Sequence, residues 1–193
     1  MSTQTESLVF SRRRVLAGTT SSVLSAGAIA LLAGIPRAHG QIGASDSDIR
    51  ILNVAVGLEY EGIGAYAIAL KSGLLDQDIT AVATKFQDDH KRHNDALIGA
   101  IRSLGGEPVV AKSEAEYAEA LNVDQLTTQQ NVLELARRLE LGATNAYIGV
   151  IPSFSDSGLA KVAARLAADE ASHFALLNFT LDRPFLPALG FGA

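Results

Sequence analysis

The sequence has no cysteine, no tryptophan and only one methionine and five prolines among its 193 residues. The absence of cysteine excludes disulfides, thiolate zinc sites, iron–sulfur clusters and cysteine nucleophiles, so any metal ion would have to be held by His, Asp or Glu. There is also no excess of positive charge. The formal net charge is -5, which argues against a nucleic-acid-binding surface. A chain of this length is typical of one domain with a sizeable core.

The first forty residues differ in composition from the rest. Residues 11–16 read Ser-Arg-Arg-Arg-Val-Leu, which resembles the twin-arginine export signal, and the small-residue sequence Ala-His-Gly ends at Gly40. The strongest apolar stretch, residues 23–35, is shorter than the roughly 20 residues that span a bilayer. We therefore predict a cleaved signal peptide over residues 1–40 and a mature domain over 41–193. Recognition by the twin-arginine export machinery would place that domain in the periplasm or another extracytoplasmic compartment. The alternative is a membrane-associated accessory protein anchored by an uncleaved N-terminus.

From residue 45 onward, apolar residues recur at spacings of three and four, which indicates helices. We predict four long helices, over about residues 46–71, 78–104, 128–151 and 158–181. The links 72–77 and 152–157 are short enough to make each pair antiparallel. A longer connection, residues 105–126, contains a predicted short helix over 113–121. The sequence thus predicts an all-α fold, a four-helix bundle of two antiparallel hairpins joined by a long crossover.

Each predicted helix has ionisable residues in the middle of its apolar stripe. In chain order these residues are Glu59, His90 and His93, Glu140, and Glu170 with His173. One unpaired buried carboxylate costs several kcal/mol, so the interruptions must compensate one another in the bundle core. Because Glu59 and His93 are equidistant from the first link, and Glu140 and His173 from the second, all four lie at matched depth.

A weak internal repeat supports this arrangement. The pattern Leu-Glu followed by Ala-Tyr occurs at residues 58–66 and again at 139–147. Asp89 precedes His93 by four residues, as Asp169 precedes His173. Two copies of a Glu helix followed by a His helix would pack about a pseudo-twofold axis. We therefore predict a symmetric site for two metal ions.

With these residues the chain resembles the ferritin-like superfamily of carboxylate-bridged dimetal proteins, over residues 46–181, and in particular its exported bacterial members. The family uses one Glu on the first and third helices and Glu-x-x-His on the second and fourth. Glu59 and Glu140 match the single Glu positions, His93 matches one His, and residues 170–173 match Glu-x-x-His. His90 departs from the pattern because it stands where the family has Glu. Three carboxylates would then supply -3 against the +4 of two divalent ions.

The resemblance implies a pair of transition-metal ions, iron first and manganese second, bound by Glu59, His90, His93, Glu140, Glu170 and His173. It implies oxidation of Fe(II) by O2 or peroxide, or peroxide removal at a dimanganese centre. It also implies that Asp89 and Asp169 hydrogen-bond ligating imidazoles, with Asp89 as a direct metal ligand the alternative.

The sequence supports further predictions for two tyrosines, for the C-terminal tail and for a competing function. Tyr66 and Tyr147 are expected in the core, where each hydroxyl needs a partner that could be a site carboxylate. The apolar C-terminal tail, residues 183–193, would cover a bundle end or meet another subunit of a homo-oligomer. The competing function is a non-catalytic structural or stress-protective bundle in which the site has become a polar core.

Overall fold

The computed structural model describes residues 44–184. The predicted signal peptide and most of the C-terminal tail lie outside the described residues. The elements in chain order are α2 (Ala44–Lys71), α3 (Gln77–Ser103), α4 (Glu114–Ala120), the 3-10 turn η1 (Val123–Gln125), α5 (Gln129–Val150), the 3-10 turn η2 (Ile151–Ser153) and α6 (Ser157–Thr180). No strand occurs between residues 44 and 184.

The four long helices and the short crossover helix begin and end close to where the sequence predicts them, and the all-α prediction is confirmed. The helix starts are fixed by side chains that satisfy free backbone N–H groups. Asp76 accepts a hydrogen bond from Ile79 N at 2.9 Å, Thr128 accepts from Asn131 N, and Asp156 accepts from Leu159 N. At the end of α3, Gly105 has a φ of 79°, a conformation that glycine adopts without steric cost.

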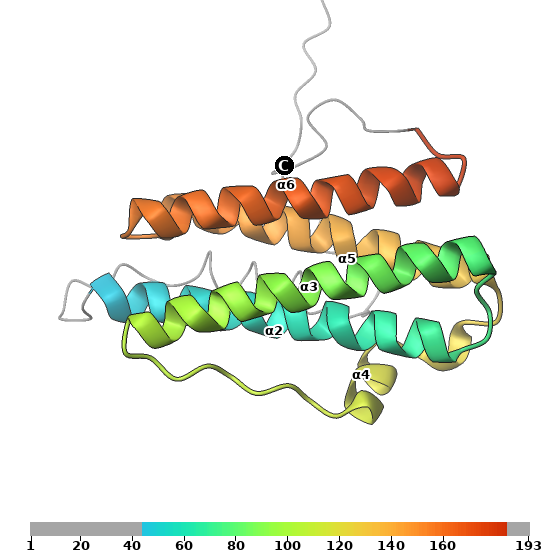
Figure 1. Ribbon diagram of the computed structural model, residues 1–193, viewed down its shortest axis with the longest axis horizontal. Coiled ribbons are helices and arrows are strands. Elements are labelled where there is room, and N and C mark those ends of the chain that lie inside the picture. The colour runs from blue at the N-terminus through green and yellow to red at the C-terminus, as the bar shows by residue number, and fades with distance from the viewer. Residues whose placement is uncertain (1–43, 185–193) are drawn as a thin grey trace, which may run out of the picture.

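Two antiparallel hairpins make up the bundle (Figure 1). Helix α2 packs along α3, and α5 packs along α6, while α2 also contacts α5. The long crossover passes along α2, where α4 lies beside it (Figure 1). Tyr117 of α4 is buried against Gly64 of α2, where a β-carbon would come within 2.7 Å of the Tyr117 ring. Lys71, the last residue of α2, forms an ion pair with Glu114, the first residue of α4.

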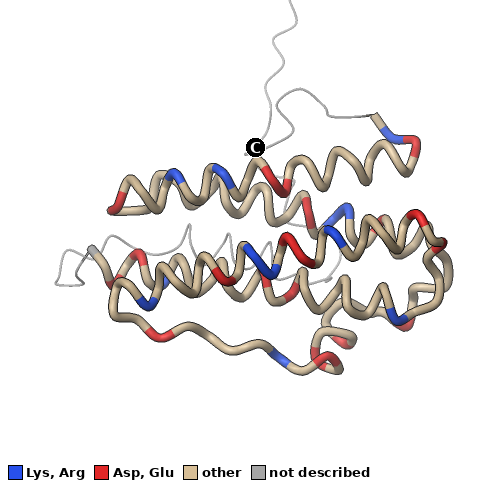
Figure 2. The backbone as a smooth tube through the Cα atoms, in the orientation of Figure 1, with Lys and Arg blue, Asp and Glu red and all other residues tan. Residues whose placement is uncertain are grey.

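Apolar clusters fill the bundle on both sides of a polar layer. One cluster is centred on Leu52, Val56, Ile101 and Leu166, and the other on Phe86, Leu133 and Leu177. Acidic residues lie near the middle of all four long helices (Figure 2). The sequence-predicted site therefore lies between two dry clusters in the centre of the bundle.

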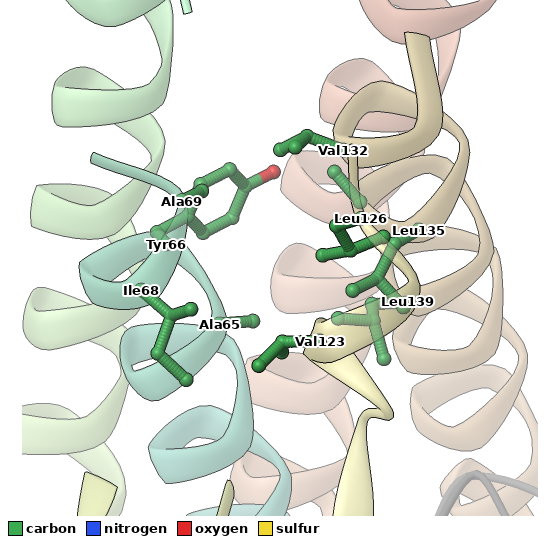
Figure 3. A pocket seen from close by; sticks show the side chains of 10 residues that line it. Ala65, Tyr66, Ile68, Ala69, Val123, Leu126, Val132, Leu135 and Leu139 are labelled. Carbon is green, nitrogen blue, oxygen red and sulfur yellow. The ribbon is translucent and has the colours of Figure 1, made fainter. Parts of the chain in front are cut away.

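A small apolar pocket opens between α2, η1 and α5. Figure 3 shows Tyr66 pointing from α2 toward Val132 and Leu135 of α5 across this pocket. Its free volume is about 20 Å³, enough for one water molecule. Among the described helices, none combines the length and apolar character needed to cross a membrane.

Candidate metal centre

The six residues predicted as ligands meet in the polar layer. The three carboxylates are the most buried, with exposed fractions of 0% for Glu170, 1% for Glu140 and 2% for Glu59. The three imidazoles are also buried, at 4% for His90, 8% for His93 and 6% for His173. The fold therefore places these residues at the matched depth that the two short links predicted. All four long helices contribute at least one of them.

The side chains form two groups. Within each group, the possible ligand atoms all lie within 4.8 Å of one another. The first group consists of Glu59, His90, His93 and Glu170. In it, His90 Nδ1 is 2.8 Å from Glu59 Oε2, and His93 Nδ1 is 3.0 Å from Glu170 Oε1. His93 Nδ1 is also 3.7 Å from Glu59 Oε1.

The second group consists of His90, Glu140, Glu170 and His173. His173 Nδ1 lies 3.4 Å from Glu140 Oε2 and 3.3 Å from Glu170 Oε2. His90 Nε2 lies 3.4 Å from Glu140 Oε1. His90 and Glu170 thus belong to both groups, and each stands three residues before a histidine, His93 or His173.

The residues fit a metal ion at this place. Glu140 Oε2, Glu170 Oε2 and His173 Nδ1 are buried and have no hydrogen-bond partner among the described residues, although such atoms are nearly always satisfied in proteins. His173 Nδ1 lies 3.4 Å from Glu140 Oε2 and 3.3 Å from Glu170 Oε2. Two tetrahedral ligands, each at roughly 2.1 Å from a metal ion, are about 3.4 Å apart. The three orphaned atoms therefore have the spacing of a ligand set.

Each site aspartate pairs with the histidine of the opposite hairpin. Asp89 Oδ2 of α3 is 3.4 Å from His173 Nε2, and Asp169 Oδ2 of α6 is 3.5 Å from His93 Nε2. In both histidines the other nitrogen, Nδ1, faces the carboxylates. This geometry keeps Asp89 on the outer side of His173, away from the orphaned atoms, and disfavours its alternative role as a direct ligand.

Both predicted core tyrosines reach a site carboxylate. Tyr66 on α2 donates a hydrogen bond to Glu140 Oε1 on α5 at 2.5 Å, and Tyr147 on α5 donates to Glu59 Oε1 on α2. Burial and the neighbouring carboxylates raise the pKa of both phenols well above the usual value. Each hydroxyl therefore keeps its proton and remains a donor, which fixes one oxygen of each carboxylate.

Close packing of opposite charges sets the electrostatics of the centre. Burial would raise the pKa of Glu59 and of Glu140, but neighbouring imidazoles outweigh burial and the pKa of each is lowered. Glu170 differs because burial and the charge of Glu140 raise its pKa. Against the effect of burial, the carboxylates raise the pKa of His93 to about 10 and that of His173 to about 9. The metal-free centre therefore holds protons where metal ions would bind.

Three residues that the sequence did not single out also shape the centre. Gly62 packs against the His90 ring, where a β-carbon would lie 3.0 Å from Cε1. Phe86 stacks on the His173 ring with centroids 3.9 Å apart. Glu61 is 4% exposed, and its Oε2 has no hydrogen-bond partner among the described residues.

A second small pocket reaches the centre from the groove between α2 and α5. Its free volume is about 20 Å³, and it is lined by Leu58, Glu61, Gly62, Tyr66, His90, Leu139 and Ala143. Apolar side chains form most of the wall, and the His90 ring is the part of the centre that the pocket touches. The pocket therefore lies directly beside the buried His90 ring.

Fold and site together define a helical bundle with buried His and Glu groups that could hold metal ions. The sequence profile of the ferritin-like domain family matches residues 47–183. The chain belongs to this family.

Two further comparisons concern single proteins. Among solved structures, the chain is similar to the conserved hypothetical protein rv2844 from Mycobacterium tuberculosis, with 20% identity and a TM-score of 0.63. The similarity covers 72% of this chain and 94% of that one. It supports the fold. No curated protein matches the sequence.

Proposed function

We propose that this protein is an exported ferritin-like protein that binds a dinuclear iron or manganese centre, oxidising Fe(II) or consuming peroxide. The observation that carries the proposal is the pair of buried groups that share His90 and Glu170. A buried cluster of this kind is costly unless its charges are compensated. One divalent ion would occupy the space that the three orphaned atoms of the second group face, and the other ion would take the place of protons in the first group.

The donor set narrows the choice of metal. Three carboxylates and three imidazoles suit iron, manganese or zinc, and there is no thiolate to favour softer ions. Oxidation chemistry requires an ion that changes its valence, which zinc does not. Iron is therefore the first candidate and manganese the second.

The protein residues hold and shield the reacting ions. Tyr66 and Tyr147 fix carboxylates, and Asp89 and Asp169 fix the outer nitrogen of each terminal imidazole, which orients its inner nitrogen. The apolar clusters on both sides exclude bulk water. Bound metal ions would supply the electrons and polarise the oxidant.

Either oxidant accepts the two electrons that two Fe(II) ions release. In the iron reaction, one O2 takes two electrons from two Fe(II) and two protons from solvent, and it leaves as hydrogen peroxide. With peroxide as oxidant, two Fe(II) and two protons convert one H2O2 into two water molecules. The pocket beside His90 admits one water molecule, and we expect the oxidant to approach the centre from this side.

The first test is metal content. The protein from residue 41 onward, purified without chelator and loaded anaerobically with Fe(II) or Mn(II), should contain two ions per chain by elemental analysis. Admission of air should oxidise the bound Fe(II). The double variant Glu170→Ala/His173→Ala should lose the metal and keep its helical circular dichroism. Metal at background under both conditions, or unchanged affinity in the double variant, would overturn the proposal.

Export is tested separately. Expression of the full chain should give a mature N-terminus at Gln41 in the soluble periplasmic fraction, and substitution of Arg12 and Arg13 by Lys should retain the precursor in the cytoplasm. A membrane-bound product that keeps residues 1–40 would instead support an uncleaved anchor.

A second candidate function is a non-catalytic protective bundle. It is favoured by the direct pairing of imidazoles with carboxylates, such as His90 with Glu59 at 2.8 Å, which partly compensates the buried charges without metal. The variant His90→Glu separates the two functions. In a metal protein it should preserve or strengthen metal binding, whereas in a polar core it would bury another negative charge and lower the melting temperature.

A further inference from the structure

His90 belongs to both groups of possible metal ligands, and its two ring nitrogens face carboxylates of different groups. Nδ1 is 2.8 Å from Glu59 Oε2, in the first group, while Nε2 is 3.4 Å from Glu140 Oε1, in the second. These nitrogens are on opposite sides of Cε1 and their lone pairs diverge. A single imidazole therefore presents one donor atom to each group.

Packing holds the ring in this orientation. A β-carbon on Gly62 would lie 3.0 Å from Cε1 and 3.1 Å from both Nδ1 and Nε2. The ring therefore lies close against the α2 backbone, and its two nitrogens are equally far from this position. The Tyr66 ring covers it at a centroid distance of 5.6 Å. With 4% of its surface exposed, His90 has little space in which to turn either nitrogen away.

Glu170 divides its donor atoms in the same way. Its Oε1 is 3.0 Å from His93 Nδ1, in the first group, and its Oε2 is 3.3 Å from His173 Nδ1, in the second. The two residues that belong to both groups are therefore the two whose donor atoms point to both. His93 and His173, by contrast, each turn Nδ1 to the centre and Nε2 to an aspartate outside it.

We propose that His90 bridges the two metal ions as an imidazolate, with Nδ1 on one ion and Nε2 on the other, beside a Glu170 carboxylate that supplies one oxygen to each. This inference rests on the proposed function, since it needs two ions. The ring releases each N–H proton to water as an ion takes that nitrogen.

Charge balance supports the bridge. Glu59, Glu140 and Glu170 supply -3 against the +4 of two divalent ions, and uncompensated charge in a buried site is costly. A neutral imidazole on one ion would leave that deficit, whereas the imidazolate adds one negative charge and removes it. A bridging histidine at this position can thus supply the negative charge of the missing carboxylate and also bind both ions.

Copper(II) is a probe that reports the bridge directly, because an imidazolate couples the unpaired electrons of two Cu(II) ions and so removes their electron paramagnetic resonance signal at low temperature. In the wild-type protein, the first equivalent of Cu(II) should give a signal and the second should abolish it. The variant Glu170→Gln should need more Cu(II) to reach two ions per chain, because it loses one metal-binding oxygen, but once doubly loaded it should also lose the signal because it retains His90. His90→Ala should instead show the signal of every copper ion that it binds.

The outcomes separate the two proposals. Fewer than two bound copper ions in the wild type overturns the bridge, and fewer than two ions per chain after loading with Fe(II) or Mn(II) overturns the dinuclear centre as well. Two bound ions with a full signal overturn the bridge alone, as does a full signal in doubly loaded Glu170→Gln. The variant His93→Ala is the matched control, since it also removes one imidazole but leaves His90, and its second copper ion should still abolish the signal. A full signal from doubly loaded His93→Ala overturns the bridge.

Discussion

Asp89 of α3 lies 3.4 Å from the outer nitrogen of His173 on α6, and not beside His93, which follows it on its own helix. Asp169 of α6 repeats the relationship with His93 of α3 at 3.5 Å. The two contacts join the hairpins on the outer side of the polar layer. Each histidine is therefore held between a carboxylate inside the centre and an aspartate from the other hairpin.

The first prediction concerns this pairing. Substitution of Asp89 by Asn removes the charge that orients His173 and should weaken metal binding roughly 10- to 100-fold, measured by calorimetric titration with Mn(II). Asp88→Asn is the control, because the Asp88 side chain is half-buried away from the centre and pairs with Lys91. Equal affinity in both variants would show that the aspartate does not act through the imidazole.

The second prediction concerns Gly62. Alanine in a helix interior is usually more stable than glycine by about 1 kcal/mol, but here the new methyl group would lie 3.0 Å from the His90 ring. Gly62→Ala should therefore displace His90 and lower both the melting temperature and the metal stoichiometry. Gly57→Ala on the same helix meets nothing within 4 Å, so it should raise the melting temperature and leave metal binding unchanged. Identical behaviour of the two variants would contradict the close packing of His90.

The sequence predicted the helices and the matched depth of six ionisable residues, because both follow from spacing along the chain. It could not predict which aspartate faces which histidine. Asp89 and His93 share a helix face, but the side chain of Asp89 points to the neighbouring helix, and only the packing of α3 beside α6 determines that partner. The contacts of Tyr66 and Tyr147 with carboxylates of the opposite hairpin likewise depend on how the hairpins pack. Gly62 could have been noticed, but its contact with His90 comes from tertiary structure.

The third prediction is a pH dependence of the metal-free protein. The pKa of His93 is raised to about 10 and that of His173 to about 9, from an ordinary value of 6.5. The folded state thus binds more protons than the unfolded state between these values, so the stability from these groups is fully present below about pH 6.5 and is lost as pH rises toward 10. Urea unfolding of the metal-free protein should show this decline. The variant His93→Gln/His173→Gln should show a flatter profile.

Metal loading should reverse the trend. Because protons and metal ions compete for the same nitrogens, metal affinity should rise with pH over this range, and the loaded protein should lose the decline in stability. An apparent affinity for Mn(II) that is independent of pH would mean that the imidazoles do not bind the ion.

The fourth prediction tests a contact far from the metal centre. Asp48 near the start of α2 is 2% exposed and accepts hydrogen bonds from Ser155 N at 2.8 Å and Asp156 N at 3.1 Å. It thereby ties the first hairpin to the link between α5 and α6. Asp48→Ala leaves these N–H groups without their acceptor and should destabilise the fold by roughly 1–3 kcal/mol in urea unfolding.

This contact also separates stability from metal binding. Asp46→Ala, an exposed substitution in the first turn of the same helix, is the control and should change stability by less than about 1 kcal/mol, the scale of a charge at a helix end. Both variants should still bind two metal ions per folded chain, because neither residue reaches the polar layer. If Asp48→Ala lost metal at a temperature where it remained folded, the two hairpins would be coupled through this link, and the centre would depend on their relative position as well as on its own side chains.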